Sequence, residues 1–323
     1  MAIDQINVTT VDTPNSLGYV VPEKWNDMLY LAAQRQMFWA KFEGAEGSLM
    51  PVIRKDDFSK EAMDVLHIST LKNLTGSGVT GASTLQGNEE QLSLAQVDLQ
   101  VDWLRHAVGV DKRSKGRVKH DVALQMAQPM LSRWMADKMD KAIFAAFETA
   151  DTVLYGGDAT STATLDASDI MSCNLLDKVS TYLKDNLAIP MTTSNGNSFY
   201  GIAIHPYDAH NLKNDTTWRQ AQRDSALRGD QNPIFTGALG TYNGIVIYEN
   251  KGVKNTTNKS KCIAFGGDAI FRGYAQMPKF ATQETDYGFN TGVAIEAVYG
   301  EKLNDVVNTN YAVIETYAAN PAV

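Results

Sequence analysis

Hydrophobic and polar residues alternate most clearly over residues 97–103. Every second residue there is apolar and those between are polar or acidic: Val97, Asp98, Leu99, Gln100, Val101, Asp102 and Trp103. This period of two predicts a strand with one apolar and one polar face. Leu92 and Leu94 follow the opposite parity, so we expect a β-bulge near Ala95 and Gln96 that bends the strand.

A weaker strand pattern over residues 63–74 precedes this strand, and a Gly- and Ser/Thr-rich segment over 75–90 joins the two. The pattern predicts a long hairpin whose loop exceeds the usual two to five residues. A two-stranded ribbon is marginal in water by itself. Its apolar stripe therefore needs a partner, and a neighbouring copy of the chain is one candidate.

The longest predicted helix covers residues 116–150. Its apolar positions step by four residues along one face: Ala127, Leu131, Met135, Met139, Ile143 and Phe147, with Leu124 and Trp134 widening the stripe. At 1.5 Å per residue it would span roughly 50 Å. Pro129 removes a backbone donor and clashes with the preceding turn, so we expect a kink there.

The remaining pattern mixes helices and strands. We expect an extended arm of about twenty residues, a helix from about Pro22 to Glu43, and a short strand from Leu49 to Ile53. Further on, a helix is predicted over 169–187, with Ser168 as its N-cap and Pro190 beyond its end.

The last third of the chain alternates between strands, short helices and loops. The predicted elements are a strand over 199–204, short helices through 227, a turn-rich segment over 236–243, a strand over 244–248, a polar loop over 252–260 and long antiparallel strands over 269–317. The sum is an α+β fold with one long helix, a long hairpin and a segregated sheet.

Composition narrows the class of protein. Of 323 residues 44% are hydrophobic and 20% charged, and no run reaches the roughly 20 apolar residues of a membrane helix. The N-terminus shows no secretion signal, and two cysteines fit a reducing compartment, so we expect synthesis in a cytoplasm. The net charge of −8 and pI of about 5.2 disfavour tight nucleic-acid binding.

One glycine motif resembles a cofactor site. Gly76, Gly78 and Gly81 match G-x-G-x-x-G, which binds a dinucleotide when a strand precedes it and a helix N-terminus follows. Residues 82–88 show no apolar period, so flexibility and close backbone approach are the favoured interpretation. A soluble nucleotide-binding enzyme that uses this loop remains a remote alternative.

Other chemistry is sparse. His205 and His210 are five residues apart, which does not stack both rings on one helical face, so a strand-end and a surface histidine are favoured over a metal site. No nucleophile, zinc-protease or P-loop motif occurs. Cys173 lies in a predicted helix and is interpreted as a small apolar filler. We therefore predict no catalytic residue, cofactor or metal.

A basic cluster stands at the start of the long predicted helix. It comprises Lys112, Arg113, Lys115, Arg117 and Lys119. Cations at a helix N-terminus oppose the helix dipole, so a partner is expected. Acidic residues of a neighbouring chain are the first choice, ahead of packaged DNA phosphate and a plain solvated face.

The order of the predicted elements resembles that of the major capsid proteins of tailed phages, which have the Hong Kong 97-type fold. These elements are the arm and helix, the Gly-tipped hairpin, the long helix and the mixed α/β end. Three strings carry the detailed similarity: Leu74–Gly81 with Leu85–Glu90, Leu104–Val108, and Phe235–Glu249. The resemblance extends over most of the chain from about residue 20.

The resemblance implies an assignment of parts: an N-terminal arm and helix over 1–45, an extended loop over 54–110, a spine helix over 114–150, a peripheral domain over 151–200 and 264–323, and an axial domain over 201–263. It implies a self-assembling, non-enzymatic subunit that forms pentamers and hexamers of an icosahedral shell around double-stranded DNA, assembled in the bacterial host cytoplasm. An encapsulin-like nanocompartment shell is the alternative.

The implied partners are other copies of the chain, a separate scaffolding protein, a portal protein, decoration or cement protein, and packaged DNA held weakly and non-specifically, with no membrane. Residues expected at inter-subunit contacts are Gly76, Gly78, Gly81, Leu85, Gly87, Glu89 and Glu90 of the hairpin, together with the basic cluster.

Overall fold

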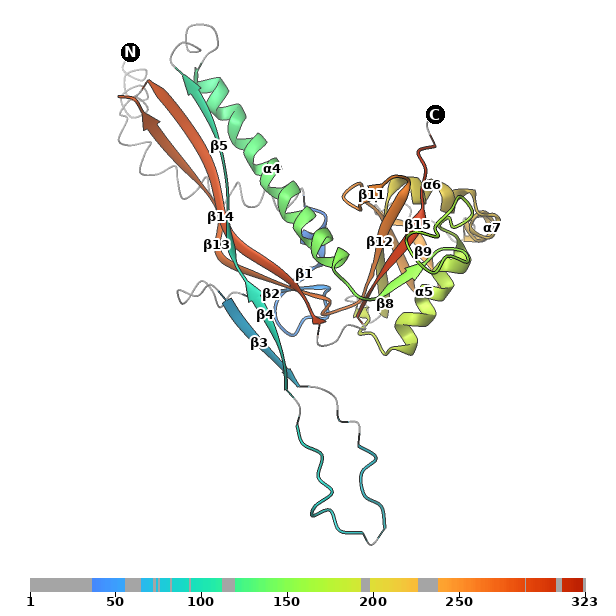
Figure 1. Cartoon of the computed structure of the whole chain (residues 1–323). Coiled ribbons are helices and arrows are strands. Elements are labelled where there is room, and N and C mark those ends of the chain that lie inside the picture. Colours follow the sequence, from blue (N-terminus) through green and yellow to red (C-terminus); the bar gives the residue numbers. More distant parts are fainter. Residues whose placement is uncertain are drawn as a thin grey trace, which may run out of the picture.

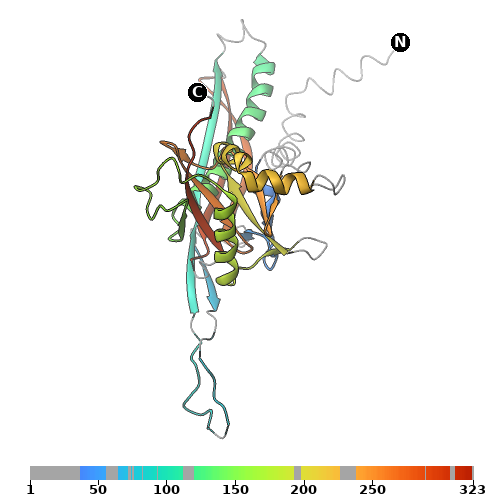
Figure 2. The same ribbon diagram turned by 90° about the vertical axis from the view of Figure 1, so that its right-hand side faces the viewer.

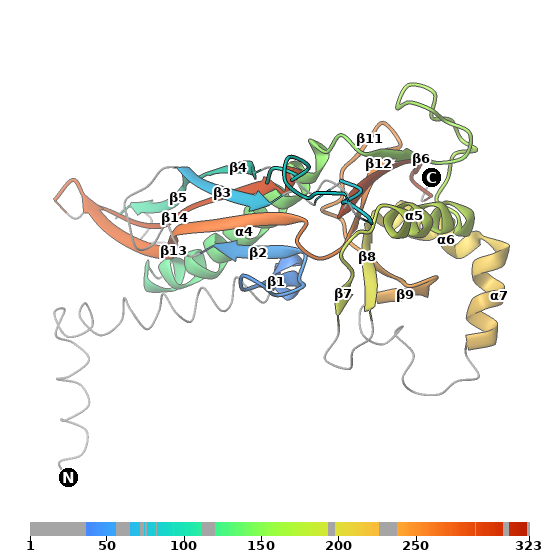
Figure 3. The same ribbon diagram turned by 90° about the horizontal axis from the view of Figure 1, so that it is seen from below.

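The computed structural model describes residues 37–55, 65–71, 74, 76–81, 83–92, 94–111, 120–192, 198–225, 238–287, 289–305 and 310–321. Within them the chain forms two lobes, a blade and a more compact body, with a ribbon that projects away from both (Figure 1). Figure 3 shows the two lobes side by side from below, joined by short crossing segments. None of the described helices is long and apolar enough to cross a bilayer.

The blade is a five-stranded sheet in the order β1-β2-β13-β14-β5. Its strands are β1 Glu43–Gly44, β2 Val52–Lys55, β13 Ile270–Thr285, β14 Asn290–Leu303 and β5 Asp102–Asp111. β13 and β14 form a long antiparallel hairpin, and β14 pairs antiparallel with β5 from Asn290 opposite Asp111 to Tyr299 opposite Asp102. The long antiparallel strands expected in this region are confirmed.

One long helix, α4 (His120–Glu148), covers one face of the blade (Figure 1). The predicted apolar stripe is confirmed, since Ala127, Leu131, Met135, Met139, Ile143 and Phe147 are all buried. The N-terminal part of the stripe packs on Val293, Ile295 and Ala297 of β14, and its C-terminal part enters the core of the other lobe. At 29 residues the helix spans roughly 44 Å.

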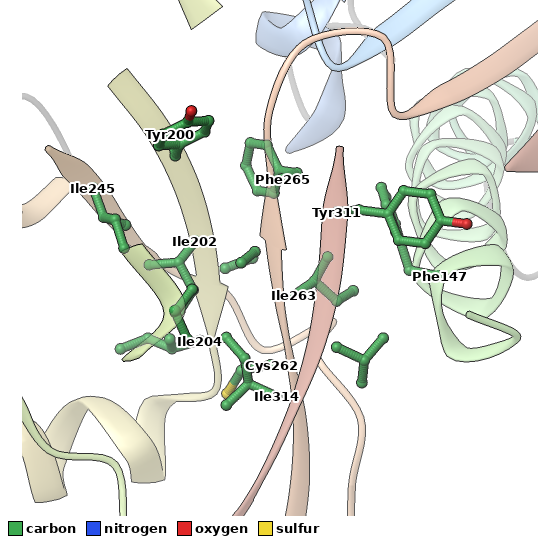
Figure 4. Close-up of a cluster of buried hydrophobic side chains, with 14 of the residues drawn as sticks. Phe147, Tyr200, Ile202, Ile204, Ile245, Cys262, Ile263, Phe265, Tyr311 and Ile314 are labelled. Carbon is green, nitrogen blue, oxygen red and sulfur yellow. The ribbon is translucent and has the colours of Figure 1, made fainter. Parts of the chain in front are cut away.

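The compact lobe is built on a second sheet in the order β6-β15-β12-β8-β10-β9, with β11 on β12 and β7 on β8. The strands are β6 Val153–Tyr155, β7 Met191–Thr192, β8 Ser198–Ile204, β9 Ala238–Tyr242, β10 Ile245–Glu249, β11 Asn255–Thr256, β12 Lys259–Phe265 and β15 Tyr311–Tyr317. Three helices accompany it: α5 Cys173–Asp185, α6 Pro206–Asn214 and α7 Thr216–Ser225. Figure 4 shows the apolar core between these elements, from Ile202 and Ile204 to Ile263 and Ile314.

An aromatic segment joins the lobes. The 3-10 helix η1 (Trp39–Phe42) places Trp39 between Phe147 of α4 and Phe265 of β12, with ring centroids 5.6 and 5.0 Å away. Trp39 is fully buried. Asp140 of α4 fixes the start of the segment, because its carboxylate accepts the backbone amides of Phe38 (2.6 Å) and Trp39 (3.2 Å).

The structure corrects the predicted N-terminal helix at its C-terminal end. Residues before Met37 lie outside the described ranges, and from Phe38 the chain forms η1 and then β1 instead of α-helix ending at Glu43. The amides of Phe38 and Trp39 donate to Asp140, so a continuous α-helix does not run through them. The predicted strand from Leu49 is real but shifted, to β2 at Val52–Lys55.

The predicted helix over 169–187 is shorter than expected. It begins at Cys173 with Ser172 as N-cap, whose hydroxyl accepts the Leu175 amide. Ser168 is not the cap, because its hydroxyl donates to Asp166 instead. Asp169 is fully buried and accepts amides of the loop before it, so its role is to hold that loop.

Three further expectations change. β4 (Leu94–Gln100) pairs with β3 (Val65–Leu71) in unbroken register, so no bulge lies at Ala95 and Gln96, and the strand is interrupted instead at Val101. Part of the turn-rich segment over 236–243 is strand β9, paired with β10. The polar loop over 252–260 contains the tight β11–β12 hairpin. Strand β8 and the short helices after it are confirmed.

Candidate assembly interface

The projecting ribbon is rooted in the blade. β3 and β4 pair antiparallel over seven residues each, from Val65 opposite Gln100 to Leu71 opposite Leu94. Figure 2 shows the ribbon and the loop beyond it extending past the rest of the molecule. At the root, a Cβ added to Gly300 of β14 would lie 1.9 Å from the carbonyl oxygen of Gln100, so glycine there permits the close approach of the two backbones.

The apolar stripe of the return strand has a partner within the same chain. Val97 and Leu99 are almost fully buried, and with Val101 they pack on Ile53, Phe271 and Val298 of the blade. The stripe therefore has the partner that the sequence predicts it needs, and that partner is the chain's own blade instead of a neighbouring copy, the one candidate named from the sequence. The stripe ends there, because Trp103 is 57% exposed instead of continuing the buried face.

Beyond the root, the apolar side chains lose their cover. The exposed leucines of the ribbon and its loop, with their exposed fractions, are Leu74 (63%), Leu85 (65%), Leu92 (71%) and Leu94 (68%). We call these four residues the tip leucines. Scattered single apolar residues on a surface are ordinary, whereas these four lie together on one thin projection.

The hairpin loop is closed by its own acidic residues. The carboxylate of Glu90 accepts the backbone amide of Gly76 at 2.7 Å, which joins the two arms of the loop. Glu89 accepts the amide of Gly87, also at 2.7 Å. The structure thus brings together four of the predicted contact residues, and the glutamates shape the loop.

Three glycines of the loop adopt the left-handed region, with φ of +66° at Gly78, +71° at Gly81 and +88° at Gly87. Glycine enters this region without the steric strain of a side chain. The described residues after the G-x-G-x-x-G motif, 83–92, form turns and no helix. The motif therefore lacks the helix N-terminus that a dinucleotide's phosphates require, and the glycines set the course of the loop.

The basic cluster over 112–119 lies outside the described residues. Its two ends are placed: β5 ends at Asp111, and α4 begins at His120. Its expected contact with a neighbouring chain stays a prediction.

The histidine and cysteine interpretations are confirmed. His205 follows β8, is buried and caps α6 by accepting the Tyr207 amide, whereas His210 is exposed. Cys173 is buried in the apolar core, and burial raises the pKa of its thiol to about 12. Among the described residues, no group of three or more His, Cys, Asp or Glu is placed to hold a metal ion.

Two buried polar clusters have no signal in the sequence. Arg272 of β13 is fully buried and reaches Glu301 (2.9 Å), Glu43 (3.6 Å) and the carbonyl oxygen of Met139 (2.8 Å). Asp208 of α6 is also fully buried and accepts the hydroxyls of Ser260 and Thr316. Burial raises the pKa of Asp208, and the donated hydrogen bonds oppose that rise.

Both clusters fasten elements that are distant in sequence: β1, α4, β13 and β14 in the first, α6, β12 and β15 in the second. Nothing in the periodic pattern around either residue sets it apart from a surface charge. Burial of this kind depends on tertiary structure.

The described residues thus form a long blade, a covering helix, a compact second lobe and a projecting ribbon with exposed leucines. The family model for phage capsid protein matches residues 23–155 and 145–318. The chain belongs to the phage capsid protein family. Its fold is the Hong Kong 97-type capsid fold, as the resemblance implied.

Curated and solved relatives agree. The major capsid protein of Pseudomonas phage KPP25 is 22% identical to this capsid protein, over 85% of the chain and 87% of the relative. The capsid of Ralstonia phage GP4 superposes with a TM-score of 0.73 at 22% identity, covering 89% and 92% of the two chains. The capsid of cyanophage Pam1 gives a TM-score of 0.72 at 19% identity, covering 88% and 93%. The relatives are structural proteins, so neither the nucleotide-binding enzyme nor the nanocompartment shell is favoured.

Proposed function

We propose that this protein is the major capsid protein of a tailed phage, and that it self-assembles into the pentamers and hexamers of an icosahedral shell around double-stranded DNA. The observation that carries the proposal is the ribbon, which is rooted firmly in its own blade and presents four exposed leucines far from it. Such a projection is suited to a different surface on another copy, and a contact of this head-to-tail kind forms a closed ring when its rotation between copies closes.

We propose a division of the chain into domains that follows its two large sheets. The spine helix corresponds to α4, and the extended loop to the β3–β4 ribbon with its tip. We propose that the peripheral domain comprises the blade and that the axial domain comprises the second sheet with α5, α6 and α7. This differs from a division at residues 200 and 264, because β6, α5 and β15 accompany β8, β10 and β12 in the same core.

The proposed partners are a separate scaffolding protein during assembly, a portal protein at one vertex, a decoration protein on the outside, and DNA inside. The net charge of −8 suits a container that holds its DNA without binding it tightly. We place assembly in the host cytoplasm and the finished protein in the virion.

The proposal is tested by expressing the full chain with and without the scaffolding protein of the same phage. Negative-stain microscopy should then reveal closed shells hundreds of ångströms across. A chain that stays a 35.4 kDa monomer under both conditions, at concentrations where related capsid proteins assemble, would contradict the proposal.

The tip leucines give a sharper prediction. Replacing Leu85 and Leu92 together by Ser should leave the monomer folded but abolish shells, because each leucine buried at a contact contributes about 1.5–3 kcal/mol. Shell yield is measured by sedimentation and microscopy, and folding by circular dichroism.

Deletion of residues 75–88 should give the same loss of shells. The matched control is Leu187→Ser, which removes an 86% exposed leucine of the compact lobe; normal shells from the double variant would rule out the assigned role.

The basic cluster gives a prediction about salt. Replacing Lys112, Arg113 and Lys115 by Ala should weaken assembly more at 50 mM than at 500 mM salt, because added ions screen exposed charge pairs. Light scattering across a salt series measures the effect. An equal loss at every salt concentration would argue against an electrostatic contact.

A further inference from the structure

Helix α6 begins with a histidine as its N-cap. Nδ1 of the His205 ring accepts the backbone amide of Tyr207 at 3.2 Å, and the His205 carbonyl oxygen accepts the amide of Ala209 at 3.0 Å. Pro206 follows as the first helical residue. Proline has no N–H, so the Tyr207 amide is the first amide of this helix that needs an acceptor. Ser, Thr, Asp and Asn usually supply that acceptor, so histidine is an unusual choice.

This cap forms in only one protonation state of the ring. An imidazole nitrogen accepts a hydrogen bond only while it carries no proton, so the neutral ring of His205 must carry its proton on Nε2. The imidazolium has a proton on both nitrogens and cannot accept the Tyr207 amide. The Tyr207 ring packs against the imidazole, with centroids 4.5 Å apart and planes at 77°, which holds the ring in the capping position.

The surroundings of the ring favour its neutral form. His205 is buried, and burial lowers the pKa of the imidazole. Among the charges that face it, Asp208 of α6 and Glu249 of β10 favour a proton on the ring, whereas Lys251 opposes one. Cys262 of β12 adds only a neutral thiol, because burial raises its pKa. The balance keeps the cap intact at neutral pH and leaves it open to protonation in acid.

The capped turn is also the part of α6 that fastens the helix to the sheet. Asp208 lies in this turn and accepts the hydroxyls of Ser260 on β12 and Thr316 on β15. α7 follows directly and is tied to the end of α6, because Arg219 donates to the carbonyl oxygen of Lys213 at 3.0 Å. The two helices lie together on the compact lobe (Figure 3). Opening the first turn of α6 would therefore loosen both helices.

We propose that His205 is a pH-sensitive cap, whose protonation in mild acid releases the Tyr207 amide and loosens α6 and α7 from the sheet of the compact lobe. A base whose pKa is lower in the closed form than in the open form gives full protection above about pH 6.5, the ordinary pKa of histidine, and loses it as pH falls. Asp208 acts with the opposite sign. Its pKa is raised by burial, so its protonation would strengthen the attachment as pH falls. The inference does not depend on shell assembly.

Hydrogen exchange of the full-length, unassembled chain tests the proposal. Protection factors of the α6 amides, which are corrected for the intrinsic effect of pH on exchange, are measured at about pH 7.5 and about pH 5.5. The wild type should lose about tenfold protection, because a histidine with an open-state pKa of about 6.5 takes up a proton over this range. His205→Asn should abolish this loss, since asparagine is a good N-cap and does not titrate. His205→Ala should be about two- to thirtyfold less protected at both pH values, the range that loss of an N-cap gives.

His210→Asn is the matched control, because His210 is exposed on the same helix and should not affect the acid response. α5 is the internal control: its amides are capped by the Ser172 hydroxyl and the Asp215 carboxylate, and their protection should stay constant.

Nitrogen NMR of the wild type, with ¹⁵N in the histidine rings only, gives a readout that does not depend on how the variants fold. It should place the His205 proton on Nε2 at about pH 7.5. A proton on Nδ1 would overturn the proposal. So would an unchanged α6 in the wild type, an equal loss of protection in α5, or the wild-type acid response in His205→Asn.

Discussion

Replacing Arg272 by Met should lower the free energy of unfolding by about 3–5 kcal/mol, the largest loss expected from a single charge in this protein. The guanidinium is fully buried, 2.9 Å from Glu301 and 3.6 Å from Glu43. Removing it leaves the nearly buried carboxylate of Glu301 without its cation, in surroundings where an uncompensated charge is strongly unfavourable. It also removes the donor to the Met139 carbonyl oxygen, and with it a link between β13 and α4.

Urea unfolding of the unassembled chain, followed by circular dichroism, measures this effect. The matched control is Arg105→Met, because Arg105 of β5 also faces a glutamate, Glu296 at 3.8 Å, but is 70% exposed. Its loss should change stability by about 0–1 kcal/mol. The double variant Arg272→Met with Glu301→Gln should recover part of the loss. Equal effects of the buried and the exposed substitution would contradict this account of Arg272.

The loss should also depend on pH in a defined direction. Burial raises the pKa of Glu301 in the folded protein, and Arg272 opposes that rise. Without the arginine the folded-state pKa rises further above its unfolded value. An acid whose pKa is raised on folding destabilises the fold where it is ionised, so the deficit relative to wild type is full at neutral pH. It should shrink as pH falls through the raised folded-state pKa and Glu301 takes up a proton.

Elements with a strong period could be predicted from the sequence. The six apolar residues of α4 that step by four are all buried, and the alternation at Val97, Leu99 and Val101 is a real strand face. These predictions succeed because period reports which face of an element is covered. Period does not report what covers that face, so the sequence left the partner of this strand open, with a neighbouring copy as one candidate. The ribbon root packs on residues from β2, β13 and β14, up to about 200 positions away in the chain.

Boundaries and caps were less predictable. Ser168 and Ser172 are equally suitable N-caps by residue type, and the choice depends on the burial of Asp169, whose carboxylate orders the loop before the helix. The predicted contact residues at the hairpin tip were partly recoverable, since glycine and glutamate in a polar loop suggest turns. That Glu90 closes the loop onto Gly76 depends on the course of the backbone, which composition does not encode.

Replacing Trp39 by Ala should lower the free energy of unfolding by about 3–5 kcal/mol, through a different mechanism. The indole is fully buried and contacts the rings of Phe144, Phe147 and Phe265, with centroids 5.0–5.6 Å away. Two of these rings belong to α4 and the third to β12, so the cavity would open between the lobes. We expect Trp39→Ala both to destabilise the chain and to loosen the lobes relative to each other.

Hydrogen exchange distinguishes these two effects: amides of η1 and of β12 should lose protection before those of β14, which lies on the other part of α4. Trp39→Phe should lose much less stability than Trp39→Ala, since it keeps a ring and removes a buried indole N–H that has no hydrogen-bond partner among the described residues. Trp103→Ala is the matched control, because Trp103 is 57% exposed and its loss should stay within about 0.5 kcal/mol. If Trp39→Ala and Trp103→Ala have similar effects, the aromatic segment does not hold the lobes together, and their orientation must be fixed by the strands that cross between them.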